Sequence, residues 1–107
     1  MDKALELFAQ DFGVSHFYPL VTGDEPVPTG GIWMKAALAN VNGAEIELIQ
    51  PLGDGENLFS NALPKDRRFA LVLHHVCIPI TGGIENWDRH RASIDEAKHP
   101  IAWCDAA

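Results

Sequence analysis

The dipeptide Asn42-Gly43 is the feature that most narrows what this chain can fold into. It separates two runs rich in apolar residues, Ile32 to Val41 and Ala44 to Gln50. Asparagine and glycine both tolerate the positive φ angles of a two-residue type I′ turn, and that turn joins neighbouring antiparallel strands. The sequence therefore predicts a β-hairpin with this dipeptide at its tip.

The two-residue turn also predicts the pairing register and the two faces of the hairpin. Counting outward from the turn places Leu38 opposite Glu47 and Ala37 opposite Leu48. Side chains alternate between faces along each strand. The face that we expect a helix to cover carries Trp33, Ala37, Ala39, Ile46 and Leu48. The other face carries Met34, Leu38, Asn40, Glu45, Glu47 and Ile49.

The segments before the hairpin predict a helix, a short strand and a loop. Apolar residues recur at helical spacing between Asp2, a suitable N-cap, and Gly13, which suits the left-handed position after a helix. The segment Ser15 to Leu20 is a candidate strand, limited by Pro19 to an edge or an end. Two prolines and three glycines in Thr22 to Gly31 predict a loop.

The second half of the chain predicts a strand and a helix after a connector. A short helix is the most that Glu56 to Leu63 can form. The β-branched and aliphatic run Phe69 to Ile80 predicts a strand, with His75 and Cys77 on one side of it. The stretch Ile84 to Lys98 is amphipathic and predicts a helix ahead of Pro100, and Ile101 to Cys104 predicts the start of another strand.

Composition excludes several classes of protein. Eight Lys and Arg against fifteen Asp and Glu leave a net charge of -7, which argues against binding to a nucleic-acid backbone. No apolar run approaches the ~20 residues of a membrane-spanning helix. Cys77 and Cys104 lie far apart, and no secretory leader pattern opens the chain, so we expect reduced thiols and a cytoplasmic protein.

The predicted elements give an α+β fold, and their residues resemble a known superfamily. The stretch G-A-E-I-E-L-I-Q-P-L-G (Gly43 to Gly53), the stretch L-H-H-V-C-I (Leu73 to Ile78) and the helices around them are similar to the vicinal oxygen chelate superfamily. Glyoxalase I, methylmalonyl-CoA epimerase, extradiol dioxygenases and bleomycin-resistance proteins belong to it. The resemblance covers nearly the whole chain.

The resemblance implies a single glyoxalase-like domain over 1–107, built of βαβββ modules with a mixed sheet and helices on one face. Residues 1–52 correspond to a first module without its opening strand, 53–68 to a connector, and 69–107 to the start of a second module. The chain is then expected to be incomplete at both termini.

The resemblance also implies a divalent metal site. By motif position, Glu47 and His75 correspond to two of the metal ligands, and Zn, Ni, Co, Mn or Fe are the candidate ions. The remaining ligands are expected on strands before residue 1 and after residue 107. Met34, Leu38 and Cys77 are expected to line the substrate site. No catalytic base is assigned, because the strand position that holds one in epimerase-like members falls near Met34, which accepts no proton.

Three functions remain open from the sequence. The first is a protein that derives from a divalent-metal-dependent lyase or isomerase, an enzyme that acts on a small carbonyl or acyl-CoA substrate. The second is a non-enzymatic module that binds a small molecule, as in the bleomycin-resistance members. The third is an inactive fragment that dimerises. Because strands with unpaired N–H and C=O groups recruit other chains, we also expect a homodimer formed through exposed sheet edges.

Overall fold

The structure is a computed structural model of the chain, and it describes residues 1–21 and 33–101. The elements follow the order α1 (Asp2–Phe12), β1 (Tyr18–Val21), β2 (Met34–Val41), β3 (Ala44–Pro51), the 3-10 turn η1 (Ser60–Ala62) and α2 (Ile84–Ser93). The described residues thus form a small α+β fold. The predicted loop Thr22 to Gly31 and all of the predicted strand after Ile101 lie outside them.

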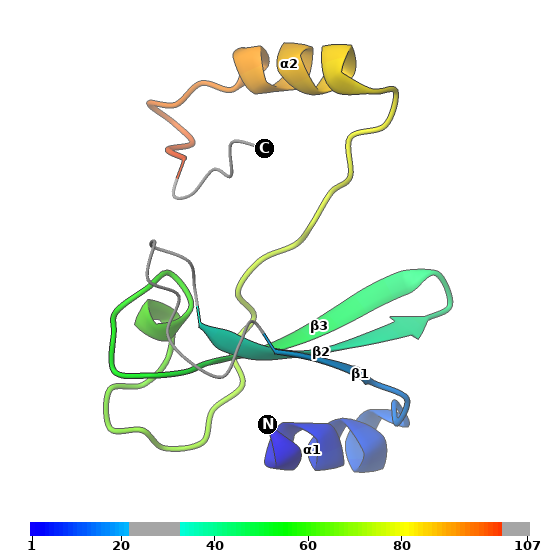
Figure 1. Cartoon of the computed structure of the whole chain (residues 1–107), viewed down its shortest axis with the longest axis vertical. Helices are drawn as coiled ribbons and strands as arrows, with labels where there is room; N and C mark the ends of the chain where they lie inside the picture. The colour runs from blue at the N-terminus through cyan, green and yellow to red at the C-terminus, as the bar shows by residue number, and fades with distance from the viewer. Residues whose placement is uncertain (22–32, 102–107) are drawn as a thin grey trace. The chain divides into compact units, whose positions relative to one another are not determined.

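The chain divides into two compact units, Met1–His74 and His75–Ala107. The first unit contains α1, all three strands and η1, and the second contains α2 (Figure 1). The boundary falls inside the segment 69–80 that the sequence predicts to be one strand. Each unit is therefore described by itself.

The predicted hairpin is confirmed, and so is its register. Asn42 and Gly43 have φ angles of 52° and 86°, the positive values that a type I′ turn requires. The Cα partners include Leu38 with Glu47 and Ala37 with Leu48. The turn is supported by the Asn40 side chain, whose Oδ1 accepts a hydrogen bond from the Gly43 N–H at 3.2 Å.

Strand β1 completes the sheet on the other side of β2. The order is β1-β2-β3, with Tyr18 opposite Leu38 and Leu20 opposite Ala36. Pro19 thus lies in an edge strand, as its missing N–H requires. All neighbouring strands are antiparallel. The prediction of a mixed sheet is therefore wrong for the described residues, because no described strand runs parallel to its neighbour.

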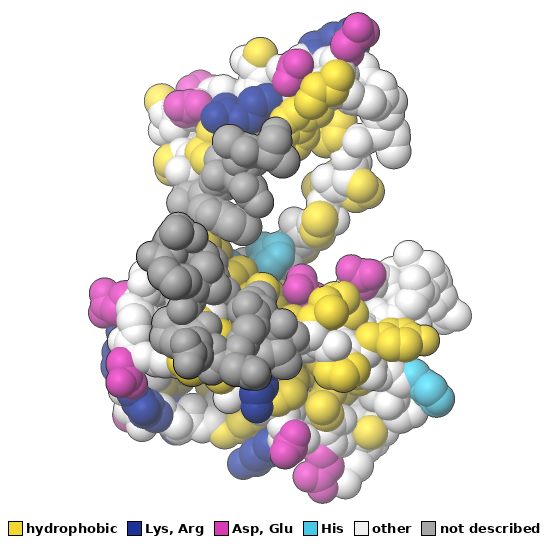
Figure 2. All heavy atoms as spheres, in the orientation of Figure 1, with side chains coloured by type: hydrophobic (Ala, Val, Ile, Leu, Met, Phe, Trp, Pro, Cys, Tyr) yellow, Lys and Arg dark blue, Asp and Glu magenta, His cyan; other side chains and the backbone are white. Residues whose placement is uncertain are grey.

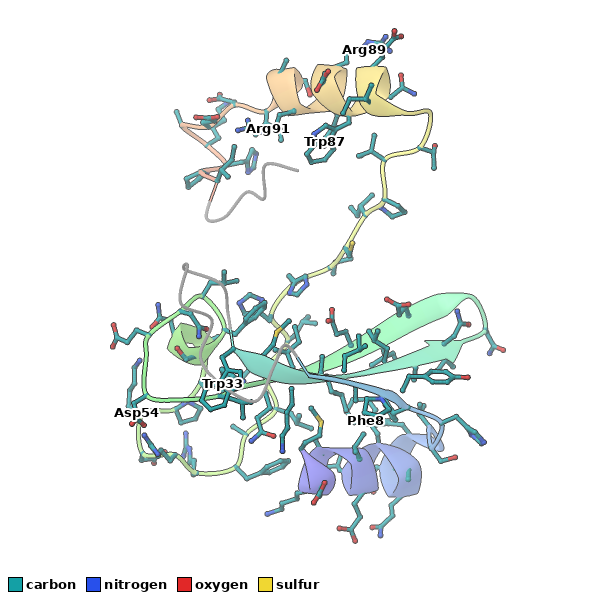
Figure 3. All side chains as sticks on the ribbon, viewed as in Figure 1. Phe8, Trp33, Asp54, Trp87, Arg89 and Arg91 are labelled. Atoms are coloured by element: carbon teal, nitrogen blue, oxygen red, sulfur yellow. The ribbon has the colours of Figure 1, made fainter. Side chains whose placement is uncertain are left out.

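Helix α1 covers one face of the sheet and forms the core of the first unit with it (Figure 1). Ala4 of α1 is buried with Ala37 and Leu48, and Phe8 and Ile46 pack against them. Figure 3 shows Phe8 pointing from α1 toward the strands. This is the face that the hairpin register predicts to be covered by a helix, and the structure confirms it.

The ends of both helices differ from prediction at one point each. Gly13 ends α1 in the left-handed conformation, as predicted, but Met1 rather than Asp2 is the N-cap, and its side chain forms no cap. Helix α2 ends at Ser93, short of the predicted Lys98, because Ile94 is extended. The Asp95 side chain then accepts a hydrogen bond from the Ala97 N–H at 3.1 Å and stabilises a turn instead of the helix.

The predicted strand over 69–80 is wrong. None of these residues belongs to a strand in the structure, although the segment is rich in β-branched and aliphatic residues. A residue of high β-propensity has a side chain that suits a pleated, half-buried surface. Such a surface forms only where a second strand supplies hydrogen bonds. No described strand pairs with this segment, so the propensity alone does not make it a strand.

Candidate functional site

The sheet of the first unit has a second face, which points away from α1. Residues directly opposite each other in an antiparallel pair lie on the same face, so the register defines this face residue by residue. We call it the distal face: Tyr18, Leu20, Met34, Ala36, Leu38, Asn40, Glu45, Glu47, Ile49 and Pro51.

Tyr18, Leu38 and Glu47 form one row across the three strands of the distal face. Leu20, Ala36 and Ile49 form the adjacent row. The first row places a carboxylate beside an aliphatic and then an aromatic side chain. Such a row offers an apolar surface with one charged group at its end.

The Leu38 and Glu47 side chains are close neighbours because of their position in the ladder. The Leu52 N–H donates to the Trp33 carbonyl oxygen at 2.9 Å, which makes Trp33 and Leu52 a hydrogen-bonded pair. Hydrogen-bonded and non-hydrogen-bonded pairs alternate, so Leu38 and Glu47 form a non-hydrogen-bonded pair. The Cα atoms of such pairs are only ~4.5 Å apart, and their side chains approach more closely than those of hydrogen-bonded pairs.

Exposure varies along the distal face. Tyr18 is 74% exposed and Leu20 is 51% exposed, whereas Ala36 is buried at 4%. Glu45 and Glu47 are exposed, and Leu38 and Ile49 are half-buried. Figure 2 shows acidic side chains beside hydrophobic ones over the strands of the first unit. The row of Tyr18, Leu38 and Glu47 is therefore more accessible than the row of Leu20, Ala36 and Ile49.

Glu47 has no hydrogen bond or ion pair among residues 1–21 and 33–101. Glu45 lies two positions away on the same strand and the same face, ~7 Å along the strand. The two carboxylates make this end of the sheet acidic in a chain that already carries a net charge of -7. A cation or a hydrogen-bond donor is the group that Glu47 is placed to bind.

The structure places the five predicted site residues in two groups. Met34, Leu38 and Glu47 share the distal face of the first unit, as the register predicts. His75 and Cys77 belong to the second unit, where both are exposed and lie outside any strand. The inference that His75 and Cys77 share the face of a strand is therefore wrong, because the alternation on which it rests exists only within a pleated strand.

Residues 1–21 and 33–101 contain no group of three or more His, Cys, Asp or Glu side chains placed to hold a metal ion. One carboxylate and one imidazole would leave most of the coordination shell of a divalent ion to water. The described residues thus do not by themselves make the ligand set that the metal enzymes of the resembled superfamily use.

Tyr18 and Leu20 are site residues that sequence reasoning missed. The segment around Pro19 is identifiable as an edge strand, but its register depends on the connection to β2, which offers no counterpart of the Asn42-Gly43 turn. The alternation of Tyr18 and Leu20 around Pro19 is the only signal that marks them as neighbours on one face.

The second unit carries an open hollow beside the start of α2. It is lined by Pro79, Ile80, Thr81, Asn86, Arg89, His90 and Ser93. Figure 3 shows where Trp87, Arg89 and Arg91 leave this helix. The described residues that line the hollow include no carboxylate or thiol, so they offer one imidazole and one guanidinium but no acidic group for acid-base chemistry.

No helix among the described residues is long and apolar enough to cross a membrane. Comparisons with known protein families, with characterised proteins and with solved structures find no match to this chain.

Proposed function

We propose that this chain is a glyoxalase-like module of the vicinal oxygen chelate kind that binds a small, carbonyl-bearing molecule on the distal face of its sheet. The observation that carries the proposal is the row Tyr18, Leu38 and Glu47, which joins apolar surface to an accessible carboxylate on the face opposite α1. The resemblance of the stretch Gly43 to Gly53 to that superfamily supports it.

The physical argument rests on what each member of the row contributes. Tyr18 and Leu38 present aromatic and aliphatic surface that an apolar ligand can remove from water. Glu47 accepts hydrogen bonds at a fixed distance from that surface, which orients a ligand that carries a donor. Binding sites commonly combine a mostly apolar lining with a few such polar groups.

Binding is tested by titrating the protein with 4-hydroxyacetophenone, a neutral probe with a carbonyl, an aromatic ring and a hydroxyl group that can donate to Glu47, while amide NMR signals are recorded. We expect the signals of Tyr18, Leu38 and Glu47 to shift together and to saturate. Tyr18→Ser should weaken binding by about fivefold or more, because it removes the aromatic surface of the row.

Phe12→Ser is the matched control, because Phe12 is an aromatic residue that is 64% exposed on α1, away from the distal face. This variant should bind 4-hydroxyacetophenone as the parent protein does. Shifts confined to α1, or equal losses in both variants, would contradict the proposed site.

A metal-dependent lyase or isomerase that acts on a small carbonyl or acyl-CoA substrate is the second candidate. The exposed carboxylate of Glu47, at the motif position of a metal ligand and with no described partner, favours it. In this candidate, Glu47 and His75 would supply two ligands to a divalent ion, and other ligands would have to come from outside the described residues.

Mn²⁺ titration separates the two candidates. Paramagnetic Mn²⁺ broadens the amide signals of nearby residues, so a specific site broadens Glu47 and His75 at lower concentrations than other acidic or imidazole residues. Glu47→Gln should abolish this effect, whereas Glu45→Gln, which changes another exposed carboxylate of the same face, should preserve it.

His75→Asn and His90→Asn form the second matched pair, since both histidines are exposed residues of the second unit. Loss of the broadening in His75→Asn alone would support the two-ligand site. Equal, weak broadening at many exposed carboxylates would reject the metal-dependent candidate and leave the binding module. If neither Mn²⁺ broadening nor binding of 4-hydroxyacetophenone is seen, the inactive dimerising fragment is the function that remains.

A further inference from the structure

We propose that residues 69–80 of one copy of this chain add a strand to the outer edge of β3 in a second copy. Two features of the described residues carry the proposal: the outer edge of β3, which offers regularly spaced backbone donors, and an apolar segment of high β-propensity that forms no strand. The edge offers backbone hydrogen-bonding groups, and the segment offers a run of residues that can pair with them as a strand.

The outer edge of β3 presents three backbone N–H groups. The Leu52 to Trp33 hydrogen bond sets the phase of the ladder, so Ala44, Ile46 and Leu48 direct their N–H groups toward β2. Glu45, Glu47 and Ile49 then direct theirs away from it. In the described sheet β3 is an edge strand, so these three donors have no strand to bind.

The other edge of the sheet, formed by β1, is less suited to pairing with an added strand. Strand β1 spans only four residues, and one of them, Pro19, has no N–H to donate. Strand β3 spans eight residues, and its only proline is Pro51 at the end. An added strand therefore finds a longer, uninterrupted set of donors and acceptors on β3.

The segment 69–80 has the composition of a strand, but none of its residues belongs to a strand in the structure. It contains no acidic residue, and Pro79 is the only residue without an N–H. Several of its apolar side chains are exposed, including Leu73 at 87%, Val76 at 75% and Ile78 at 76%. Exposed β-branched and aliphatic side chains in succession are typical of a strand that pairs with another chain.

Charge favours the same pairing. The β3 edge carries the exposed carboxylates of Glu45 and Glu47. Arg67 and Arg68 lie directly before the segment, and their side chains are 82% and 73% exposed. Their ion pairs with Asp54 and Asp66 are also exposed and so hold them only weakly. The edge is negatively charged and the two arginines that precede the segment are positively charged, so their charges are complementary.

A second copy is the occupant because the chain contains both halves of the interaction. In the structure two residues of the segment, both in the first unit, contact other parts of that unit: the Lys3 ammonium group lies 4.7 Å from the centroid of the Phe69 ring, and His74 Nε2 lies 2.9 Å from the Leu58 carbonyl oxygen. A two-fold pair of copies would each give one segment and receive one, which closes both edges at once.

Amide hydrogen exchange at low and high protein concentration tests the proposal, together with sedimentation to measure the dimer. We expect the amides of Glu45, Glu47 and Ile49 to exchange at least about tenfold more slowly in the dimer than in the monomer. The amides of Ala44 and Leu48 are the internal control, because β2 already protects them in both states.

Ile78→Asp and Ile84→Asp are the matched variants. Ile78 lies in the segment and Ile84 on α2, and they are 76% and 69% exposed. Because Ile78→Asp adds a negative charge to a strand that meets an acidic edge, it should raise the dimer dissociation constant at least about tenfold. Ile84→Asp should change it by less than about twofold.

Three results would overturn the proposal. One is a chain that stays monomeric at millimolar concentration. Another is a dimer in which the Glu45, Glu47 and Ile49 amides exchange as fast as in the monomer, which would place the interface elsewhere. The third is protection of these amides that does not depend on concentration, which would show that the chain's own segment occupies the edge.

Discussion

Helices α1 and α2 are nearly equal in length, yet they differ in what surrounds them. The eleven residues of α1 pack against a sheet and bury Ala4, whereas the ten residues of α2 bury none. None of residues 75–101 is buried. A helix of this length is marginal by itself, because most helical stability in proteins comes from packing of an apolar face.

The comparison teaches where the stability of this chain lies. In the first unit a hydrogen-bonded hairpin presents small and aliphatic side chains, Ala37 and Leu48, to an apolar stripe of α1. In the second unit, Ile84 and Trp87 remain 69% and 43% exposed. The amphipathic pattern is present in both helices, but only α1 has a sheet within its own unit to pack against.

Hydrogen exchange should show the largest difference between the two regions. The amides of Ala44, Ile46 and Leu48 bond to β2 beside the core, so we expect them to exchange at least about a hundredfold more slowly than those in the middle of α2. The measurement is amide exchange followed by NMR. Equal protection of α2 would mean that its apolar side chains are covered, contrary to the comparison.

Leu48→Ala should have the largest effect on stability. It removes a side chain that is only 8% exposed and packs with Ala4 and Ala37, so we expect the free energy of unfolding to fall by about 2 to 4 kcal/mol. Urea unfolding followed by circular dichroism measures it. The control is Ile49→Ala, at the neighbouring residue, whose side chain lies on the opposite face of the sheet. It should lower the free energy of unfolding by about 1 kcal/mol, because Ile49 is half-buried.

Gly43→Ala tests the hairpin turn that aligns the first unit. At a φ of 86°, an added Cβ meets no atom within 4 Å, but the backbone conformation itself is unfavourable for an L side chain. We expect a loss of about 1 kcal/mol in the same urea measurement. Gly55→Ala, at a glycine that needs no positive φ and has open space around it, should lose less than about 0.5 kcal/mol.

Ile84→Ala should have the smallest effect. Ile84 is 69% exposed at the start of α2, so truncating it removes little buried surface. The free energy of unfolding should change by less than about 0.5 kcal/mol. A loss as large as that of Leu48→Ala would show that the second unit has a core which includes Ile84.

Local chemistry made part of the fold and of the candidate site predictable. Asn42-Gly43 specifies a turn with one register, and the register alone places Met34, Leu38 and Glu47 on one face. Gly13 likewise marks the end of α1, because a left-handed residue follows the helix. Tyr18 and Leu20 could not be placed in this way, since no short turn ties β1 to β2.

The sequence by itself determined the hairpin, its two faces and the amphipathic stripes of both helices, because turn residues and side-chain periodicity act over a few neighbouring residues. Only the tertiary structure decided which apolar segments receive a partner. Residues 69–80 have the composition of a strand, and α2 has an apolar stripe, but a strand forms where backbone groups of another strand meet it, and a helix face is buried where another surface packs on it. Those partners are distant in the chain, so no local pattern encodes them.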